Sequence, residues 1–254
     1  MKWHDLERFS RGLIDVSLPI RSGMFPISAA SNVRLRTIQG YESETGMFET
    51  QLRMSCHAGT HIDYPAHVNP DGARAFSESG FRDLLFPHST LTLAYFLPFD
   101  DKQPTDPLPE GEWAWGDRIE EEEVRAWFDH FDAAHPEFPH ERVEGALFRT
   151  GWHDHWFEAE FWQRGDPTLT SEAAAYLMER GLRYLASDFT FTFEGDATHD
   201  VVLTHPEGNR FLVENLCNLG QIDSDVVGLF IAPLKVESCE ALPARVYAIP
   251  LGVA

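Results

Sequence analysis

Cysteine is scarce in this sequence, in which only Cys56, Cys217 and Cys239 occur among 254 residues. An odd number of thiols spaced this widely excludes a disulfide framework, and it forms no Cys-x-x-Cys metal motif. The three side chains are expected to be small buried apolar groups of a protein kept in a reducing compartment.

Basic residues are also few, and almost all of them are arginine. Lys and Arg number 20 against 41 Asp and Glu, so the formal charge is −21, and the only lysines are Lys2, Lys102 and Lys235. A field this negative repels phosphate backbones and anionic lipid surfaces. Neither a nucleic acid nor a membrane is expected as a partner.

Long apolar runs and several well-known motifs are missing as well. No window approaches the ~18 apolar residues of a membrane span, and residues 1–20 carry acids where a secretion signal needs an apolar stretch. We therefore expect a cytoplasmic protein. The absence of G-x-G-x-x-G, Walker, G-x-S-x-G and H-E-x-x-H motifs removes the main support for nucleotide-binding, serine hydrolase and zincin functions.

The patterns that are present favour one domain spanning residues 1–254, with many strands and few helices. Runs of β-branched and aromatic residues predict strands at 33–38, 48–56, 90–97, 145–150, 184–188, 211–216, 226–234 and 245–249. One helix is predicted to start at Asp117 with a capping box to Glu120, and a second covers 171–180 and stops at Gly181. The proline-rich acidic segment 100–116 is expected to be an exposed loop. The fold class is α/β, a single domain with a mixed sheet.

Three histidines and an aspartate are concentrated in eleven residues, Cys56 being followed by His57, His61, Asp63 and His67. In an extended chain His61 and Asp63 point the same way, and Gly59 allows the chain to curl so that His57 joins them. Two imidazoles and a carboxylate on one side form a facial ligand set with open positions for water and substrate. The pattern indicates a catalytic metal site.

Other interpretations of these residues remain. Any one of the histidines alone more often satisfies a loop carbonyl than it binds a metal. Cys56 could ligate or attack, although packing at the end of a strand is the more common role of such a residue.

The string His57-Ala-Gly-Thr-His61-Ile-Asp63-Tyr-Pro-Ala-His67 resembles the H-x-G-T-H-x-D-x-P-x-H signature of the metal-dependent cyclase-like hydrolases, a family that includes bacterial kynurenine formamidases and isatin hydrolases. Three further segments, residues 14–20, 148–152 and 211–219, are similar to the same family and occur in its order. The resemblance implies the swivelling β/β/α fold of the family.

The resemblance also implies a role for each matching residue. His57, His61 and Asp63 correspond to metal ligands, with Asp63 bridging two cations, and His67 corresponds to the catalytic acid/base. Glu214, which precedes an Asn-Leu pair where the family has Asn-Leu or Gly-Leu, corresponds to the second bridging ligand. The remaining ligand is a histidine upstream of Glu214. His199 is favoured for this position over His205, although it stands farther from Glu214 than is usual in the family.

The resemblance further implies a divalent metal, zinc or manganese, bound as two ions. The expected activity is hydrolysis of an aromatic amide or lactam C–N bond, as in N-formylkynurenine or isatin, by metal-activated water. Phe25 stands where kynurenine formamidases place a substrate-contacting tryptophan, so it is the expected substrate-binding residue, with core packing as the alternative. That difference leaves a lactone substrate open, and a non-catalytic binding protein is the rival from another class. Arg149 could serve either the sheet or the substrate.

Assembly is expected from the family and from the N-terminal segment. Residues 1–20 place apolar side chains at helical spacing, so this arm is expected to cover a second copy in a homo-oligomer, a dimer or tetramer. Packing on its own core is the alternative. These side chains are Trp3, Leu6, Phe9, Leu13 and Ile14.

Overall fold

The computed structural model describes residues 12–24, 33–72, 91–109, 114–156, 158, 163–191, 197–208 and 210–252. The strands are β1 (Ile14–Asp15), β2 (Arg34–Gln39), β3 (Glu49–Arg53), β4 (His61–Asp63), β5 (Leu91–Pro98), β6 (Arg118–Ile119), β7 (Gly145–Arg149), β8 (Thr168–Leu169), β9 (Tyr184–Ser187), β10 (Phe211–Glu214), β11 (Val226–Pro233) and β12 (Ala241–Leu251). The helices are α3 (Glu121–Ala134), α4 (Ser171–Glu179) and α5 (Thr198–Leu203).

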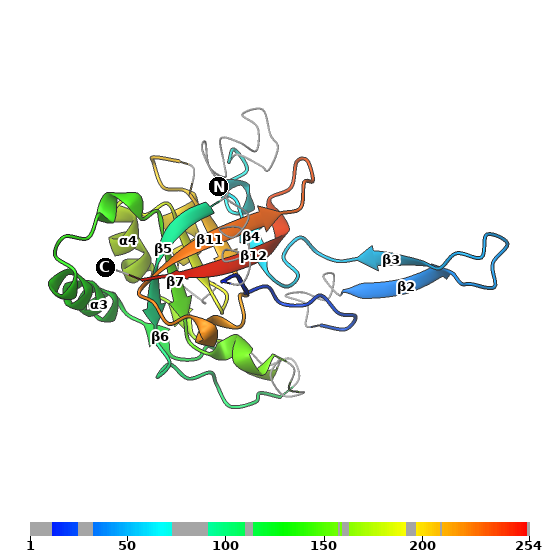
Figure 1. Cartoon of the computed structure of the whole chain (residues 1–254), viewed down its shortest axis with the longest axis horizontal. Coiled ribbons are helices and arrows are strands. Elements are labelled where there is room, and N and C mark those ends of the chain that lie inside the picture. The colour runs from blue at the N-terminus through cyan, green and yellow to red at the C-terminus, as the bar shows by residue number, and fades with distance from the viewer. Residues whose placement is uncertain are drawn as a thin grey trace.

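Eight strands form a mixed sheet in the order β1-β12-β11-β5-β7-β9-β10-β4, which closes into a barrel because β4 also pairs with β12. The neighbouring strands β5, β7, β9 and β10 are parallel, so their carboxyl ends lie at the same edge. Figure 1 shows the barrel strands grouped in the body of the molecule, with α3 and α4 on one side. The predicted α/β mixed sheet is confirmed, and closure removes the exposed strand edges that an open sheet would leave.

Successive side chains along each strand point alternately to the inner and the outer surface of the barrel. Phe211 and Val213 of β10 point into the interior with Ile62 of β4, where a buried apolar cluster fills the barrel. Leu212 faces outward and belongs to a second core between the barrel and the helices. The outward face of β4 and β10 is therefore buried without being inside the barrel.

The helical layer forms where apolar residues recur on one helix face. Val124, Phe128 and Phe131 of α3 are buried in the outer core, together with Leu177 of α4. The start predicted at Asp117 is wrong by several residues: Glu120 is the N-cap, and it forms the capping box with Glu123. The preceding residues pair as β6 with β8, a long-range contact that local capping rules do not contain.

The second predicted helix agrees with α4, since the chain leaves it through Gly181 at φ +87°. Each predicted strand has a counterpart in the structure, whereas the short strands β1, β4, β6 and β8 and the helix α5 were not expected. The described part of segment 100–116 contains no helix or strand. None of the helices in the described ranges is long and apolar enough to cross a lipid bilayer.

Candidate metal centre

Strand register brings three of the predicted ligands onto one surface. In the antiparallel pair of β10 and β4, Glu214 is opposite His61, and Leu212 is opposite Asp63. Paired residues of neighbouring strands share a face, as do residues two apart along a strand. His61, Asp63 and Glu214 therefore point to the same outer surface of the barrel, and all three are buried.

The turn before β4 needs the small residue that the sequence places there. Gly59 has φ +67°, and a Cβ at this position would lie 2.6 Å from Ile20 Cδ1. The hydroxyl of Thr60 accepts a hydrogen bond from Leu18 N (2.9 Å) and donates one to Asn215 O (2.5 Å). Glycine suits both the positive φ and the limited space at this position. The turn that it forms brings His57 back toward Asp63.

The residue after Glu214 also has an unusual backbone. Asn215 has φ +60°, in the left-handed region that asparagine and glycine tolerate best. The chain turns there, and Leu216 N donates to Ser187 O. This backbone explains why either Asn or Gly suits the position that follows the glutamate.

Two short segments bring the remaining predicted residues close to these ligands. His199 lies in the first turn of α5, a helix that contacts β10, and His67 ends a 3₁₀ turn, Pro65–His67, that contacts α5. The ring centroid of His67 lies 4.4 Å from that of His57 and 5.5 Å from that of His199. His205 lies in the turn after α5, where its Nδ1 accepts a hydrogen bond from Glu207 N. The structure thus places His199 in the cluster and His205 outside it.

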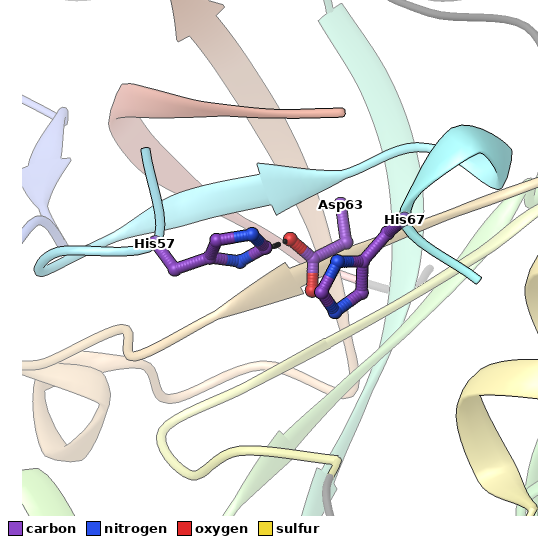
Figure 2. Close-up of side chains that lie close together, drawn as sticks. All are labelled: His57, Asp63 and His67. Atoms are coloured by element: carbon purple, nitrogen blue, oxygen red, sulfur yellow. Dashed lines mark ion pairs between the residues drawn. The ribbon is translucent and has the colours of Figure 1, made fainter. Parts of the chain in front are cut away.

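Asp63 is at the centre of the cluster, as Figure 2 shows for His57 and His67 on either side of it. Its Oδ1 lies 2.9 Å from His57 Nδ1 and 3.5 Å from His61 Nε2, while its Oδ2 lies 3.4 Å from His199 Nε2. Glu214 repeats this arrangement, with Oε2 3.4 Å from His61 Nε2 and Oε1 3.3 Å from His199 Nε2. Two carboxylates are thus each shared between imidazoles.

Backbone carbonyls fix the orientation of two of these imidazoles. His61 Nδ1 lies 2.8 Å from Gly59 O, and His199 Nδ1 lies 3.1 Å from Phe191 O. A carbonyl only accepts, so a proton on each Nδ1 satisfies these contacts and leaves Nε2 facing the carboxylates. Histidine ligands of metals in proteins are held in this way. Glu214 is oriented similarly, because its Oε1 accepts from Phe191 N at 2.9 Å.

The charges of the cluster require a positive partner. Burial raises the pKa of Asp63, but the surrounding imidazoles, His61 first, outweigh it and hold that pKa well below its usual range. Burial lowers the pKa of His199, but Asp63 and Glu214 outweigh it and raise that pKa to about 10. The ionised carboxylate of Asp63 helps to raise the pKa of His57 and of His199, which is how a cation site behaves when protons take the place of the cation.

Buried polar atoms without hydrogen-bond partners also indicate a cation site. Within the described residues, His61 Nε2 and both oxygens of Asp63 are buried without a partner of hydrogen-bond geometry. Leaving such groups unsatisfied is costly, and binding a divalent cation would remove that cost. Two overlapping groups have ligand atoms close enough for one ion: His57, Asp63 and His67, and His61, Asp63 and Glu214. The donor set therefore fits a divalent metal.

The accessible side of the cluster is formed by histidines. The side chains of Asp63, His61 and Glu214 are at most 3% exposed, whereas those of His57 and His199 are 16% exposed and His67 is exposed at the surface. Burial lowers the pKa of His67 below its ordinary value. The carboxylates thus lie at the buried base of the cluster, and the more exposed imidazoles lie on the side of His67.

Sequence reasoning missed two residues of this neighbourhood. Thr60 ties the turn to Asn215, and its signal was its fixed place in the His-x-Gly-Thr-His string. Glu240 lies just before β12, with Oε1 3.6 Å from His57 Nε2, and no local pattern links it to the cluster. Phe25, the expected substrate-binding residue, and residues 1–11 of the N-terminal arm lie outside the described residues.

Arg149 lies away from the cluster. Its guanidinium pairs with Asp100 and lies 3.3 Å from Asp154, and it lines a cavity of about 450 Å³ beyond the ends of β5 and β7. None of the predicted metal-site residues lines this cavity. Asp188 accepts hydrogen bonds from Thr150 N and Gly151 N, so the segment around residues 148–152 has clear structural roles.

A closed mixed barrel with an imidazole–carboxylate cluster on its outer face defines an α/β protein with a candidate centre for divalent cations. The family model described as "Putative cyclase" matches residues 14–192, and the chain belongs to this cyclase family. No curated protein matches the chain.

Solved structures share the fold. An isatin hydrolase bound to the product analogue thioisatinate has a TM-score of 0.72 at 19% identity, covering 99% of this chain and 100% of that one. Isatin hydrolase A from Ralstonia solanacearum gives 0.67 at 19% identity, covering 98% and 96%. A protein described as a predicted metal-dependent hydrolase, from Bacillus stearothermophilus, gives 0.61 at 23% identity, covering 93% and 97%. At these identities the likeness establishes the fold.

The choice between His199 and His205 can be measured directly. We expect His199→Ala to lose at least one equivalent of bound metal, because its Nε2 faces both carboxylates. We expect His205→Ala, a matched change nearby, to keep its metal because it lies outside the cluster. Metal content after dialysis, determined by elemental analysis, decides the point, and loss of metal in His205→Ala alone would reverse the assignment.

Proposed function

We propose that this protein is a metal-dependent hydrolase that cleaves the C–N bond of an aromatic amide or lactam, with N-formylkynurenine and isatin-like lactams as candidate substrates. The observation that carries the proposal is the convergence of ligand atoms on Asp63, whose buried oxygens face three imidazoles. His67 lies beside them at the exposed side.

The residues divide naturally between two ions, zinc or manganese. His57 and His61 would hold one ion and His199 would hold the other. The carboxylates of Asp63 and Glu214, each of which faces both His61 and His199, would be shared between the two ions. Nitrogen and carboxylate donors of this kind suit both metals. A bound divalent cation polarises a carbonyl and lowers the pKa of water.

His67 is the proposed proton carrier. Its ring lies close to those of His57 and His199, and its exposure allows contact with substrate. A ring nitrogen of His67 accepts a proton from the attacking water and returns it to the departing nitrogen as the C–N bond breaks. Water adds to the carbonyl carbon, and the products are a carboxylic acid and an amine, which share one molecule when the substrate is a lactam.

A covalent route through the nearby cysteine is disfavoured. Burial, followed by contact with Cys239 and Glu240, raises the pKa of Cys56 to about 11. A thiol that remains protonated at neutral pH is a weak nucleophile. The proposed hydrolysis therefore proceeds by direct attack of water.

The aromatic substrate class has two supports. The isatin hydrolases that share this fold act on an aromatic lactam, and the turn between His57 and His61 adjoins a small apolar cluster. Ala58 of that turn packs with Met24 and Val33, with Ile20 and Met54 against them. Such side chains suit contact with an aromatic ring better than with a charged substrate.

The test is a substrate panel combined with metal removal. Protein loaded with Zn²⁺ or Mn²⁺ is assayed with N-formylkynurenine, isatin and an aromatic lactone, before and after chelation. We expect turnover of an amide or lactam that chelation abolishes and added metal restores. Turnover of the lactone alone would contradict the amide proposal, and tight metal binding without any turnover would favour a non-catalytic binding protein.

A further inference from the structure

His57 is oriented differently from the other two imidazoles around the carboxylates. His61 and His199 turn Nδ1 toward backbone carbonyls and Nε2 toward the carboxylates. His57 reverses this arrangement, because its Nδ1 lies 2.9 Å from Asp63 Oδ1 (Figure 2). A cation held between His57 and Asp63 would therefore bind Nδ1, and the single proton of the neutral ring would be on Nε2.

The outer nitrogen of His57 faces a carboxylate instead of a carbonyl. Within the described residues no backbone oxygen accepts a hydrogen bond from this ring, and Glu240 Oε1 lies 3.6 Å from Nε2. This is an ion-pair contact, slightly longer than a hydrogen bond. Glu240 forms no other ion pair in the described part of the chain, so its carboxylate is available to His57.

Closure of the barrel places Glu240 beside the metal centre. The strand β12 begins at Ala241, which is the register partner of Asp63 at the end of β4. Tyr64 N donates a hydrogen bond to Glu240 O at 3.0 Å, so the backbone of Glu240 is anchored to the residue that follows Asp63. A side chain that is anchored by strand pairing can hold a ligand more precisely than one on a free loop.

Two carboxylates compete for the one proton of neutral His57. A proton on Nδ1 donates to Asp63 and blocks the position of the cation, whereas a proton on Nε2 donates to Glu240 and leaves Nδ1 free to bind metal. His61 and His199 do not have this choice, because the carbonyls beside their Nδ1 atoms only accept. Glu240 can therefore do for His57 what these carbonyls do for the other two rings.

We propose that Glu240 is a positioning residue of the metal centre, which accepts a hydrogen bond from His57 Nε2 and holds Nδ1 of that ring toward the cation. Carboxylates behind metal-bound histidines fix the tautomer and raise the basicity of the ligating nitrogen. A cation on Nδ1 makes the Nε2 hydrogen more positive, so the contact tightens when metal binds. The proposal rests on the metal centre of the proposed function and is independent of the substrate.

Zinc affinity of three variants tests the role of Glu240. Each chain is titrated with Zn²⁺ against a competing chelator. We expect Glu240→Ala to lower the affinity by about 10- to 100-fold, the usual effect of losing a group that hydrogen-bonds to a metal ligand. Glu240→Gln should fall between this variant and the wild type, because its amide oxygen accepts the hydrogen bond without the charge. Glu237→Ala removes the same charge from an exposed residue of the same loop and should bind Zn²⁺ as the wild type does.

Nuclear magnetic resonance of the Zn²⁺-loaded protein, with ¹⁵N-labelled histidine, tests the orientation itself. We expect His57 to bind zinc through Nδ1 and to carry its proton on Nε2, whereas His61 and His199 bind through Nε2. In Glu240→Ala the Nε2 proton of His57 should exchange faster with water. A general loss of stability would not confine that change to one ring.

Three results would overturn the proposal: zinc on Nε2 of His57, wild-type affinity in Glu240→Ala, or an equal loss of affinity in Glu237→Ala. A wild-type chain that binds no Zn²⁺ would overturn both this proposal and the proposed function. Zinc results as expected, without hydrolysis of any substrate, would contradict the proposed function alone.

Discussion

Replacement of Asp63 by alanine is expected to abolish both metal binding and hydrolysis. Its two oxygens face different imidazoles, so the change removes a ligand from both proposed ion positions at once. It also removes one of the two carboxylates that offset the charge of the cations. Loss of a residue that only hydrogen-bonds to a metal ligand typically lowers the affinity for the metal by about 10- to 100-fold. Loss of a ligand shared by two ions should lower it further. Elemental analysis and turnover measure the two effects.

Two further variants test whether the negative charge of Asp63 is what holds the metal, rather than its shape or the burial of a carboxylate in general. Asp63→Asn keeps a neutral oxygen but loses the charge, so it should retain little metal if charge is essential. Asp166→Asn changes another buried aspartate, one that accepts hydrogen bonds from Thr190 and belongs to neither candidate ligand group. It should bind metal normally. Normal metal stoichiometry in Asp63→Ala would disprove the assignment of the centre.

Replacement of His67 by alanine is expected to separate activity from metal binding. The ring lies at the exposed side of the cluster, 4.4 Å from that of His57. If it carries the proton, hydrolysis should fall by about 10²- to 10⁴-fold, the usual effect of losing a general acid/base. Metal content should stay at the wild-type level because the five other residues still supply the ligands.

The alternative for His67 has a structural basis, since its ring nitrogen, His57 and Asp63 are close enough together to share one ion. Loss of metal along with activity in His67→Ala would make it a ligand. Retention of both would place the proton on another group, with Glu214 the next to test. His130→Ala, which changes an exposed histidine of α3, provides the matched control and should leave metal and turnover unchanged.

Local sequence was sufficient where short-range geometry controls the outcome. The pairing of His61 with Asp63 follows from the two-residue repeat of an extended chain, and the turn at Gly59 follows from the freedom of glycine at positive φ. The strands of the barrel could be predicted because their apolar runs reflect burial on both faces. The end of α4 was equally predictable, because Gly181 adopts the left-handed backbone of a helix stop.

Local rules failed where a distant partner changed the balance. Aspartate is a common N-cap residue, which is why Asp117 was expected to start the helix. Residues 118–119 instead form β6, because β8 pairs with them. The six residues of α5 are too few to form a stable helix alone, and this helix depends on packing against β10 and α4. Propensity could not predict either element, since long-range contacts stabilise both.

The sequence by itself determined the chemistry of the centre: which imidazoles and carboxylates are available, and that His57, His61 and Asp63 share one short segment. The tertiary structure decided which distant residues join them. His199 and His205 both precede Glu214 at possible spacings, and only the position of α5 against β10 brings His199 to the carboxylates while His205 turns away. Closure of the barrel between β4 and β12 likewise brings Glu240 to His57. Such choices depend on the packing of whole elements, which no local pattern of residues encodes.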